Sequence, residues 1–184
     1  MSTDVNLEID AADICERLVG ITPIYLQNFL TRDLYGLRSS IKSGKVRAQR
    51  RLFSREDVFG IALVWLLFES GLRGEPLTRI LNDLAEIKKV DANRAAERLL
   101  AAGADYLLVI RKARRPSKSI PEKPDQKVAM VKKDELSSFL DQFSDAGILI
   151  IPVGAKFADV RLRLDVLFDF RTQGEKENVP LQAR

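Results

Sequence analysis

A short break, Gly20-Ile21-Thr22, separates two stretches of helical periodicity near the start of the chain. The first stretch predicts a helix over 10–20, because glycine is favoured just past a helix C-terminus. Thr22 is a good N-cap and Pro23 suits the first helical position, so a second helix is expected from Pro23 to about Tyr35. Two short helices with such a connection form a helix-turn-helix. The residues expected to face inward are Ile9, Ala12, Cys15, Leu18 and Val19 in the first helix and, mostly, Ile24, Leu26, Phe29 and Leu30 in the second.

The next segment, 36–53, is basic and carries Gly44 between two loosely alternating runs, which predicts a β-hairpin. The whole chain has a net charge of only +4, but residues 34–55 include seven basic side chains and no acidic one. A second stretch, 111–133, has nine basic and two acidic residues. Such segregation favours polyanions as partners, although each stretch could instead be a solvated loop. The basic residues of the first stretch are Arg38, Lys42, Lys45, Arg47, Arg50, Arg51 and Arg55.

Two further helices are expected after the hairpin. Ser54 is an N-cap candidate with Glu56 and Asp57 in the first turn, a pattern typical of a helix start. The strongly apolar helix that follows ends near Gly71. A turn then leads into a helix whose apolar residues have helical spacing over 77–87. We expect these two helices to pack as a pair.

Residues 14–84 resemble the winged-helix DNA-binding domain of MerR-type transcription regulators. The most specific match is the passage Arg50–Val58, with sequence RRLFSREDV, where the wing leads into the third helix. The Ile21-Thr22 opening of the second helix and the Gly71-Leu72 turn match in the same order. The family usually carries an Arg-Tyr pair where this chain has Gln27-Asn28. The resemblance therefore implies a winged helix that binds double-stranded DNA, with a base preference of its own.

Candidate binding residues follow from this resemblance and from the chemistry of DNA. The major groove admits one helix, and amide side chains suit adenine whereas arginine suits guanine or phosphate. Basic residues of the wing are expected to contact phosphates, which position a protein without selecting sequence. The alternative for the amides is an ordinary solvated helix face. The readout candidates are Thr22, Tyr25, Gln27, Asn28 and Arg32, and the phosphate candidates are Lys42, Lys45, Arg47, Arg50 and Arg51.

Helical and strand patterns alternate after Val90, which predicts a small α/β region over 91–170. Residues 157–170 fit a helical stripe, although part of the run also alternates as a strand would; we interpret them as helix. Residues 171–184 are polar and are expected to be a disordered tail. The expected fold class is mainly α, with a winged helix-turn-helix domain in 1–90. The other expected elements are helices over 91–102 and 134–143, strands over 106–110, 127–131 and 147–153, and an exposed loop over 113–126.

The composition excludes several kinds of chemistry. The chain has no histidine and a single cysteine, so Cys-His zinc sites, iron–sulfur clusters, Ser-His-Asp catalysis and intrachain disulfides lack their residues. Cys15 is expected to lie in the core, and Trp65 and Phe68 to pack rather than bind a cofactor. We predict no enzymatic activity, no metal and no cofactor. The carboxylates of the second half, Asp134, Glu135 and Asp141, are expected on a solvated helix face.

No membrane partner is expected, because the longest apolar run has eight residues and a membrane-spanning helix needs about 20. The first ten residues lack basic side chains, so we expect no secretory signal and a cytoplasmic protein. The predicted function is a sequence-specific DNA-binding transcription regulator that acts as a homodimer through its C-terminal half. Residues 91–170 are expected to serve in dimerisation or effector sensing, and the sequence leaves the identity of a small-molecule effector open. The alternative is an accessory or interaction module that binds nucleic acid through charge alone. The residues expected to form the dimer interface are Phe157, Val160, Leu164, Leu167 and the strand Ile148–Val153.

Overall fold

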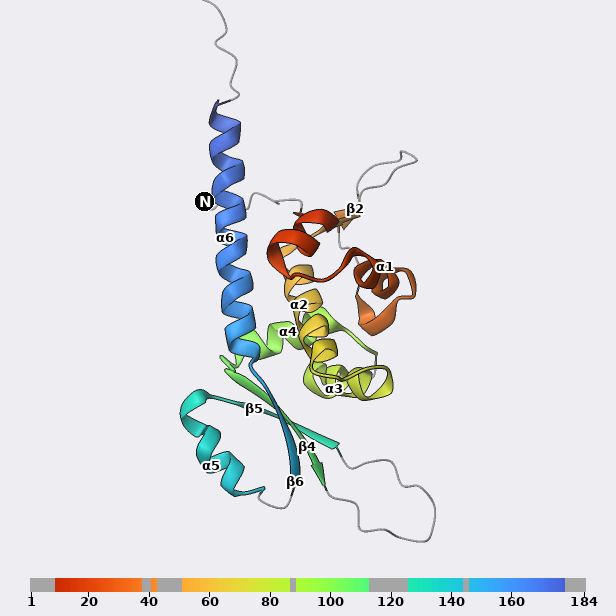
Figure 1. Cartoon of the computed structure of the whole chain (residues 1–184), viewed down its shortest axis with the longest axis vertical. Helices are drawn as coiled ribbons and strands as arrows, with labels where there is room; N and C mark the ends of the chain where they lie inside the picture. Colours follow the sequence, from red (N-terminus) through yellow and green to blue (C-terminus); the bar gives the residue numbers. More distant parts are fainter. Residues whose placement is uncertain are drawn as a thin grey trace, which may run out of the picture.

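A computed structural model describes residues 9–37, 41–42, 51–86, 89–112, 126–143 and 146–177. The fold is mainly helical with two small antiparallel sheets, as expected at this level (Figure 1). The long helix α6 runs along one side of the N-terminal helices, and the second sheet lies at its lower end. In chain order the elements are β1 (Ile9–Asp10), η1 (Asp13–Leu18), α1 (Pro23–Thr31), η2 (Leu34–Gly36), β2 (Ile41–Lys42), β3 (Arg51–Phe53), α2 (Arg55–Glu69), α3 (Glu75–Ala85), α4 (Ala92–Ala101), β4 (Tyr106–Lys112), β5 (Gln126–Val131), η3 (Lys133–Glu135), α5 (Leu136–Asp141), β6 (Ala146–Ile151) and α6 (Val153–Glu177).

Two short helices meet at the predicted break. η1 is a wide, π-type helix, and α1 begins at Pro23 after Thr22 in an extended conformation. Gly20 has a φ of +78°, a left-handed conformation that side chains with a Cβ rarely adopt, so glycine suits the position where the chain leaves η1. Ile9 was expected on the first helix but lies in β1, because its backbone pairs with Phe53.

The second helix is shorter than predicted. α1 ends at Thr31 rather than near Tyr35, because Asp33 and Tyr35 have φ values of +48° and +62° that no α-helix accommodates. The resulting turn lets the Tyr35 hydroxyl accept a hydrogen bond from the Gly74 N–H over 3.2 Å. The same turn sets the Tyr35 ring edge-on to Phe29, with centroids 5.4 Å apart. Tertiary contacts therefore override the helical periodicity of this stretch.

The predicted hairpin is confirmed in its paired strands. β2 and β3 are antiparallel, with Ile41 opposite Leu52, and residues 43–50 between them lie outside the described part of the chain. Ser54 caps α2 as predicted: its Oγ accepts from the Asp57 N–H over 3.2 Å, and Asp57 Oδ2 accepts from the Ser54 N–H over 2.9 Å. This capping box fixes the point at which the first sheet leads into α2.

Helix α2 is the centre of the fold. It contacts α3, as predicted, and also packs along α4 and α6. Asp57 Oδ1 accepts a hydrogen bond from Asn93 Nδ2 on α4 over 2.7 Å. Gly60 permits this approach, because a Cβ there would overlap the Asn93 side chain. Trp65 is buried and Phe68 packs against the core, which confirms that both are packing residues.

The second half holds a three-stranded antiparallel sheet of order β5-β4-β6, with α5 between β5 and β6 in sequence. The expected alternation of helices and strands is confirmed. β6 differs from its prediction, since it ends at Ile151 and leaves Ile150 exposed at the edge of the sheet. Val153, expected to end this strand, instead begins α6. Of the expected loop over 113–126, residues 113–125 lie outside the described part of the chain.

The helical interpretation of 157–170 is correct, but α6 extends further in both directions. It includes 171–177, which the sequence analysis assigned to a disordered tail. These residues are mostly good helix formers, and an interior glycine such as Gly174 costs a helix only about 1 kcal/mol, so the helix continues. Residues 178–184 lie outside the described part of the chain. None of the helices in the described ranges is long and apolar enough to cross a membrane.

One hydrophobic core runs through both halves of the chain. The inner face of α6 is buried against the N-terminal helices, and the Phe157 ring lies edge-on to Phe59 with centroids 5.5 Å apart. The prediction that this face forms a dimer interface is therefore wrong, because these side chains are already covered within one chain. The predicted interface residues buried in this way are Phe157, Val160, Leu164 and Leu167 on α6, together with Ile151 and Val153. The rest of the predicted strand is not covered in this way, since Ile148 and Leu149 are half-buried and Ile150 is exposed.

Candidate nucleic-acid interface

Helix α1 is held to the body of the protein by one face. Leu26 and Phe29 are buried, and the Phe29 ring lies 5.6 Å from Phe68 of α2. Tyr25, predicted to face outward, is 39% exposed but also packs, with its ring centroid 5.5 Å from Trp65 and 5.1 Å from Phe68. An aromatic cluster therefore fixes α1 on α2, and Tyr25 lies at the boundary between this cluster and solvent.

The opposite face of α1 is exposed. Gln27 and Asn28 both lie on it, as predicted. Ile24 was expected to point mostly inward, and this is wrong: its side chain is 73% exposed. Thr31, which the sequence analysis did not select, is also exposed. The positions 24, 27, 28 and 31 follow the spacing of a single helix face, and this spacing from Gln27 and Asn28 could have identified the other two.

The two ends of α1 carry the remaining readout candidates. Thr22 is exposed at the N-cap, and its side chain makes no capping hydrogen bond to the helix. Its hydroxyl can therefore act towards a ligand rather than towards α1. Arg32 is exposed at the C-cap, one residue past the last helical turn. The arginine thus lies at one end of the exposed face rather than within it.

Arg51 of the hairpin lies beside α1. It is exposed, and its backbone pairs with that of Lys42. Arg51 and Gln27 line the same hollow, of about 530 Å³, between η1 and α1, with Glu16 also on its wall. The structure therefore brings one readout candidate and one phosphate candidate together. The phosphate candidates Lys45, Arg47 and Arg50 lie outside the described residues, as does the side chain of Lys42.

Comparison with protein-family models and with curated proteins finds no match. The chemistry of the surface itself is therefore the guide to function. The exposed face of α1 offers two amides and a hydroxyl, groups that donate and accept hydrogen bonds at once. A guanidinium lies beside it on β3. Amides next to a guanidinium suit a ligand that carries both hydrogen-bond donors and acceptors for the amides and a negative charge for the guanidinium.

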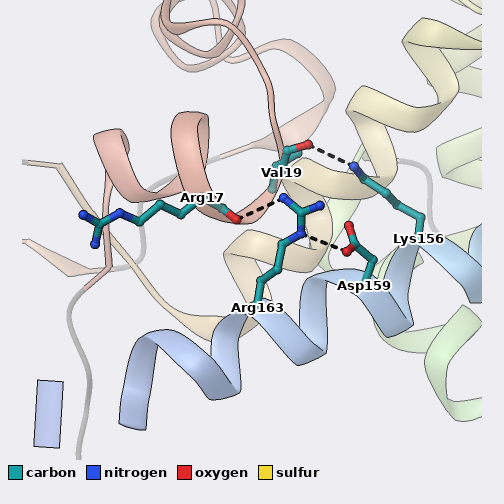
Figure 2. A network of polar contacts seen from close by, with 5 residues as sticks. All are labelled: Arg17, Val19, Lys156, Asp159 and Arg163. Carbon is teal, nitrogen blue, oxygen red and sulfur yellow. Dashed lines mark hydrogen bonds and ion pairs between the residues drawn. The ribbon is translucent and has the colours of Figure 1, made fainter. Parts of the chain in front are cut away.

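Helix α6 contacts the end of η1 through two cations, a contact that the sequence analysis missed (Figure 2). Lys156 Nζ donates to the Val19 carbonyl over 2.9 Å, and Arg163 Nη1 donates to the Arg17 carbonyl over 3.3 Å. Asp159 orients Arg163 by accepting from its Nε over 2.8 Å. We refer to these bonds as the α6–η1 contact. It lies directly before the turn that leads into α1.

The outer side of α6 carries an exposed apolar row. Leu162, Val166 and Phe170 follow one another at intervals of four residues and are 65%, 47% and 71% exposed. They line a groove of about 730 Å³ that Arg17 of η1 also borders. Side chains four residues apart lie one above another on a helix, so the row forms one continuous surface.

Cys15 is buried, as predicted. Burial raises the pKa of its thiol, and the neighbouring Glu16 carboxylate raises it further, so the thiol is protonated at neutral pH. Asp134, Glu135 and Asp141 are exposed, as predicted. Among the described residues, no three or more histidine, cysteine or acidic side chains are grouped so that they could hold a metal ion.

Proposed function

We propose that this chain is a sequence-specific DNA-binding transcription regulator, and that its N-terminal part is a winged helix-turn-helix of the kind its resemblance to MerR-type regulators implies. The observation that carries the proposal is the exposed face of α1. Gln27 and Asn28 lie side by side on a helix whose opposite face, Leu26 and Phe29, is anchored in the core. A rigidly held helix with outward amides is the element that reads bases in the major groove.

The two parts of the surface have different roles in this proposal. α1 enters the major groove, where its amides form paired hydrogen bonds with base edges. The hairpin lies on the backbone, where its cations neutralise phosphates and supply affinity that is independent of sequence. Arg51 and Gln27 line the same hollow. This supports the division, because a residue assigned to phosphate and a residue assigned to base edges then lie on one surface. The hairpin residues assigned to phosphate are Lys42, Lys45, Arg47, Arg50 and Arg51.

The protein binds its site as a homodimer in this proposal, because one helix reads only a few base pairs and a two-fold dimer doubles the site. The interface is the outer row of α6, in place of the buried residues named by the sequence analysis. Leu162, Val166 and Phe170 support it, since a continuous exposed apolar row at helical spacing suits pairing with another helix. The role of the protein is binding, and no residue is assigned a catalytic part.

Selection of bound sequences from random double-stranded DNA tests the specific function. We expect one enriched motif, to which the full chain binds far more tightly than to unrelated DNA of equal length. The double variant Gln27→Ala with Asn28→Ala should lose the preference for this motif and keep its affinity for unrelated DNA. The matched control is Gln142→Ala, an exposed glutamine after α5, which should bind as the unmodified protein does.

The charge-driven alternative makes a different prediction in the same assay. An accessory protein that binds through cations alone would show no enriched motif and would be displaced equally by unrelated DNA. The variant Arg51→Ala should lower affinity for every DNA and reduce the slope of log affinity against log salt by about one. Absence of DNA binding at moderate salt would contradict both functions.

The dimer is tested by light scattering of the full chain. We expect twice the chain mass, and we expect Leu162→Glu to reduce it to that of one chain, because a charge in the apolar row cannot be desolvated without a partner. The control is Met130→Glu, which changes an exposed apolar residue of β5 and should leave the dimer intact. A full chain of single mass would show that the outer row of α6 is not a dimer interface.

A further inference from the structure

The exposed face of α1 includes an isoleucine that does not contribute to the core. Ile24 is 73% exposed, more than any other large apolar side chain of the described residues. It lies at the second position of α1, on the same face as Gln27 and Asn28. Single exposed apolar residues are common on protein surfaces. This one shares a helix face with the two amides that the proposed function assigns to base readout.

The face has a definite chemical composition. Ile24 is apolar, Gln27 and Asn28 carry amides, Thr31 carries a hydroxyl, and all four are uncharged. Arg32 lies past the end of the helix, so no cation is positioned among them. In the major groove, glutamine and asparagine pair with N6 and N7 of adenine, and an apolar side chain contacts the C5-methyl group of thymine. Each of these contacts is made to an A·T pair.

We propose that Ile24 is a specificity-determining residue that contacts a thymine methyl group, and that the half-site read by α1 is built from A·T pairs. This inference rests on the proposed function and names the bases that it reads. Ile24 is near the N-terminus of α1, the end of a recognition helix whose side chains meet base edges. Ile24 and Thr31 are separated by about 10 Å along the helix axis at 1.5 Å per residue, which spans about three base pairs.

Replacement of thymine by deoxyuridine tests the contact directly, because it removes the methyl group and leaves every hydrogen-bonding group of the base pair in place. We take the duplex selected by the full chain and replace its thymines one at a time. One replacement in each half-site should weaken binding about fourfold, the effect of withdrawing one buried methyl group. Binding is measured by fluorescence anisotropy at fixed salt.

The variant Ile24→Ala completes the test. It should bind the thymine and deoxyuridine duplexes with equal affinity, and Ile24→Val should keep part of the discrimination. Because Ile24 is exposed, both variants should unfold in urea at the same midpoint as the unmodified chain. The matched control is Met130→Ala, an exposed apolar substitution on β5, which should retain the full thymine preference.

The outcomes separate this inference from the proposed function. If a motif is selected but every deoxyuridine duplex binds equally well, the role of Ile24 is refuted and specific DNA binding stands. If the selected half-site lacks A·T pairs, the same conclusion follows. If Ile24→Ala changes the mass of the full chain in light scattering but not its thymine preference, Ile24 belongs to a protein interface. If no motif is selected, the proposed function fails and this inference fails with it.

Discussion

The Lys156 ammonium donates a hydrogen bond of 2.9 Å to the Val19 carbonyl, across a separation of 137 residues in the chain. This carbonyl lies just past the end of η1, where backbone acceptors lack partners within the helix. A cation there is also favoured by the helix dipole. Lys156 therefore completes the C-terminus of η1 and holds the chain immediately before Gly20. α6 thus holds the residue before the turn into α1, while the aromatic cluster holds α1 itself on α2.

Lys156→Met should lower the free energy of unfolding by about 1 kcal/mol, because it removes a partly buried charged hydrogen bond and keeps most of the apolar stem. It should also weaken binding to the selected DNA motif more than binding to unrelated DNA, since the turn that leads into α1 loses its bond to α6. Urea unfolding followed by Trp65 fluorescence measures the first effect. The control is Lys127→Met, an exposed lysine of β5. Equal stability of the two variants would show that the bond contributes nothing.

Two leucines on opposite sides of α6 should respond very differently to the same substitution. Leu164→Ala should destabilise the chain by about 2–5 kcal/mol, because it leaves a cavity in the core that both halves share. Leu162→Ala should change the stability of a single chain by less than about 0.5 kcal/mol, because its side chain is exposed. Urea unfolding at a protein concentration low enough to exclude dimers provides the comparison. A small effect of Leu164→Ala would mean that α6 is not part of a common core.

Asp57 should contribute more to stability than its capping partner. Its carboxylate accepts from the Ser54 N–H over 2.9 Å and from Asn93 Nδ2 over 2.7 Å, so it joins the start of α2 to α4. Ser54→Ala should cost about 1 kcal/mol, as is usual for an N-cap. Asp57→Ala should cost about 2–4 kcal/mol, because it also leaves the half-buried Asn93 amide without its acceptor. Equal losses in thermal or urea unfolding would contradict the second role of Asp57.

Cys15 should react slowly with thiol reagents in the folded protein. Its pKa is raised by burial first and by the Glu16 carboxylate second, so the thiolate is scarce below pH 9. Folding favours the protonated thiol. The stability that this adds is fully present below the pKa of Cys15 in the unfolded chain, and it is lost as pH rises through the pKa of Cys15 in the folded protein. Glu16→Gln should speed the reaction at pH 8 by lowering this pKa. The rate of thiol labelling, followed spectroscopically with and without urea for the unmodified chain and for Glu16→Gln, checks both the slow reaction and the effect of Glu16. A labelling rate that urea leaves unchanged would contradict the burial of Cys15.

Local chemistry determined which elements could be predicted. The turn at Gly20 and the capping residue Ser54 act within a few positions, so the sequence pattern is sufficient to place η1, α1 and the start of α2. The end of α1 was missed because the contact between Tyr35 and Gly74, 39 positions apart, overrides its helical pattern. Lys156 was missed for the same reason. No local signal links it to Val19.

Ile24 shows a different limit of the sequence pattern. Amphipathic periodicity assigns large apolar residues to the inner face of a helix, because burial normally stabilises them. That rule placed Leu26 and Phe29 correctly and Ile24 incorrectly. The inner face of α1 is filled by an aromatic cluster that includes Tyr25, which the prediction had placed outside. A residue that the rule misplaces in this way is a candidate for contact with a partner.

The bond between Lys156 and Val19 also sets an order of events during protein synthesis. At about 5–20 residues per second, Lys156 is added to the chain about 7–27 s after Val19. For most of that interval, once residue 53 has been added, the growing chain already contains the basic residues of the hairpin, but η1 lacks the Lys156 that bonds its C-terminus. Under the proposed function, a nascent or prematurely ended chain would therefore be attracted to DNA before it could select a site. Under the proposed function, selective binding is complete only after the ribosome has added Lys156 and the rest of α6.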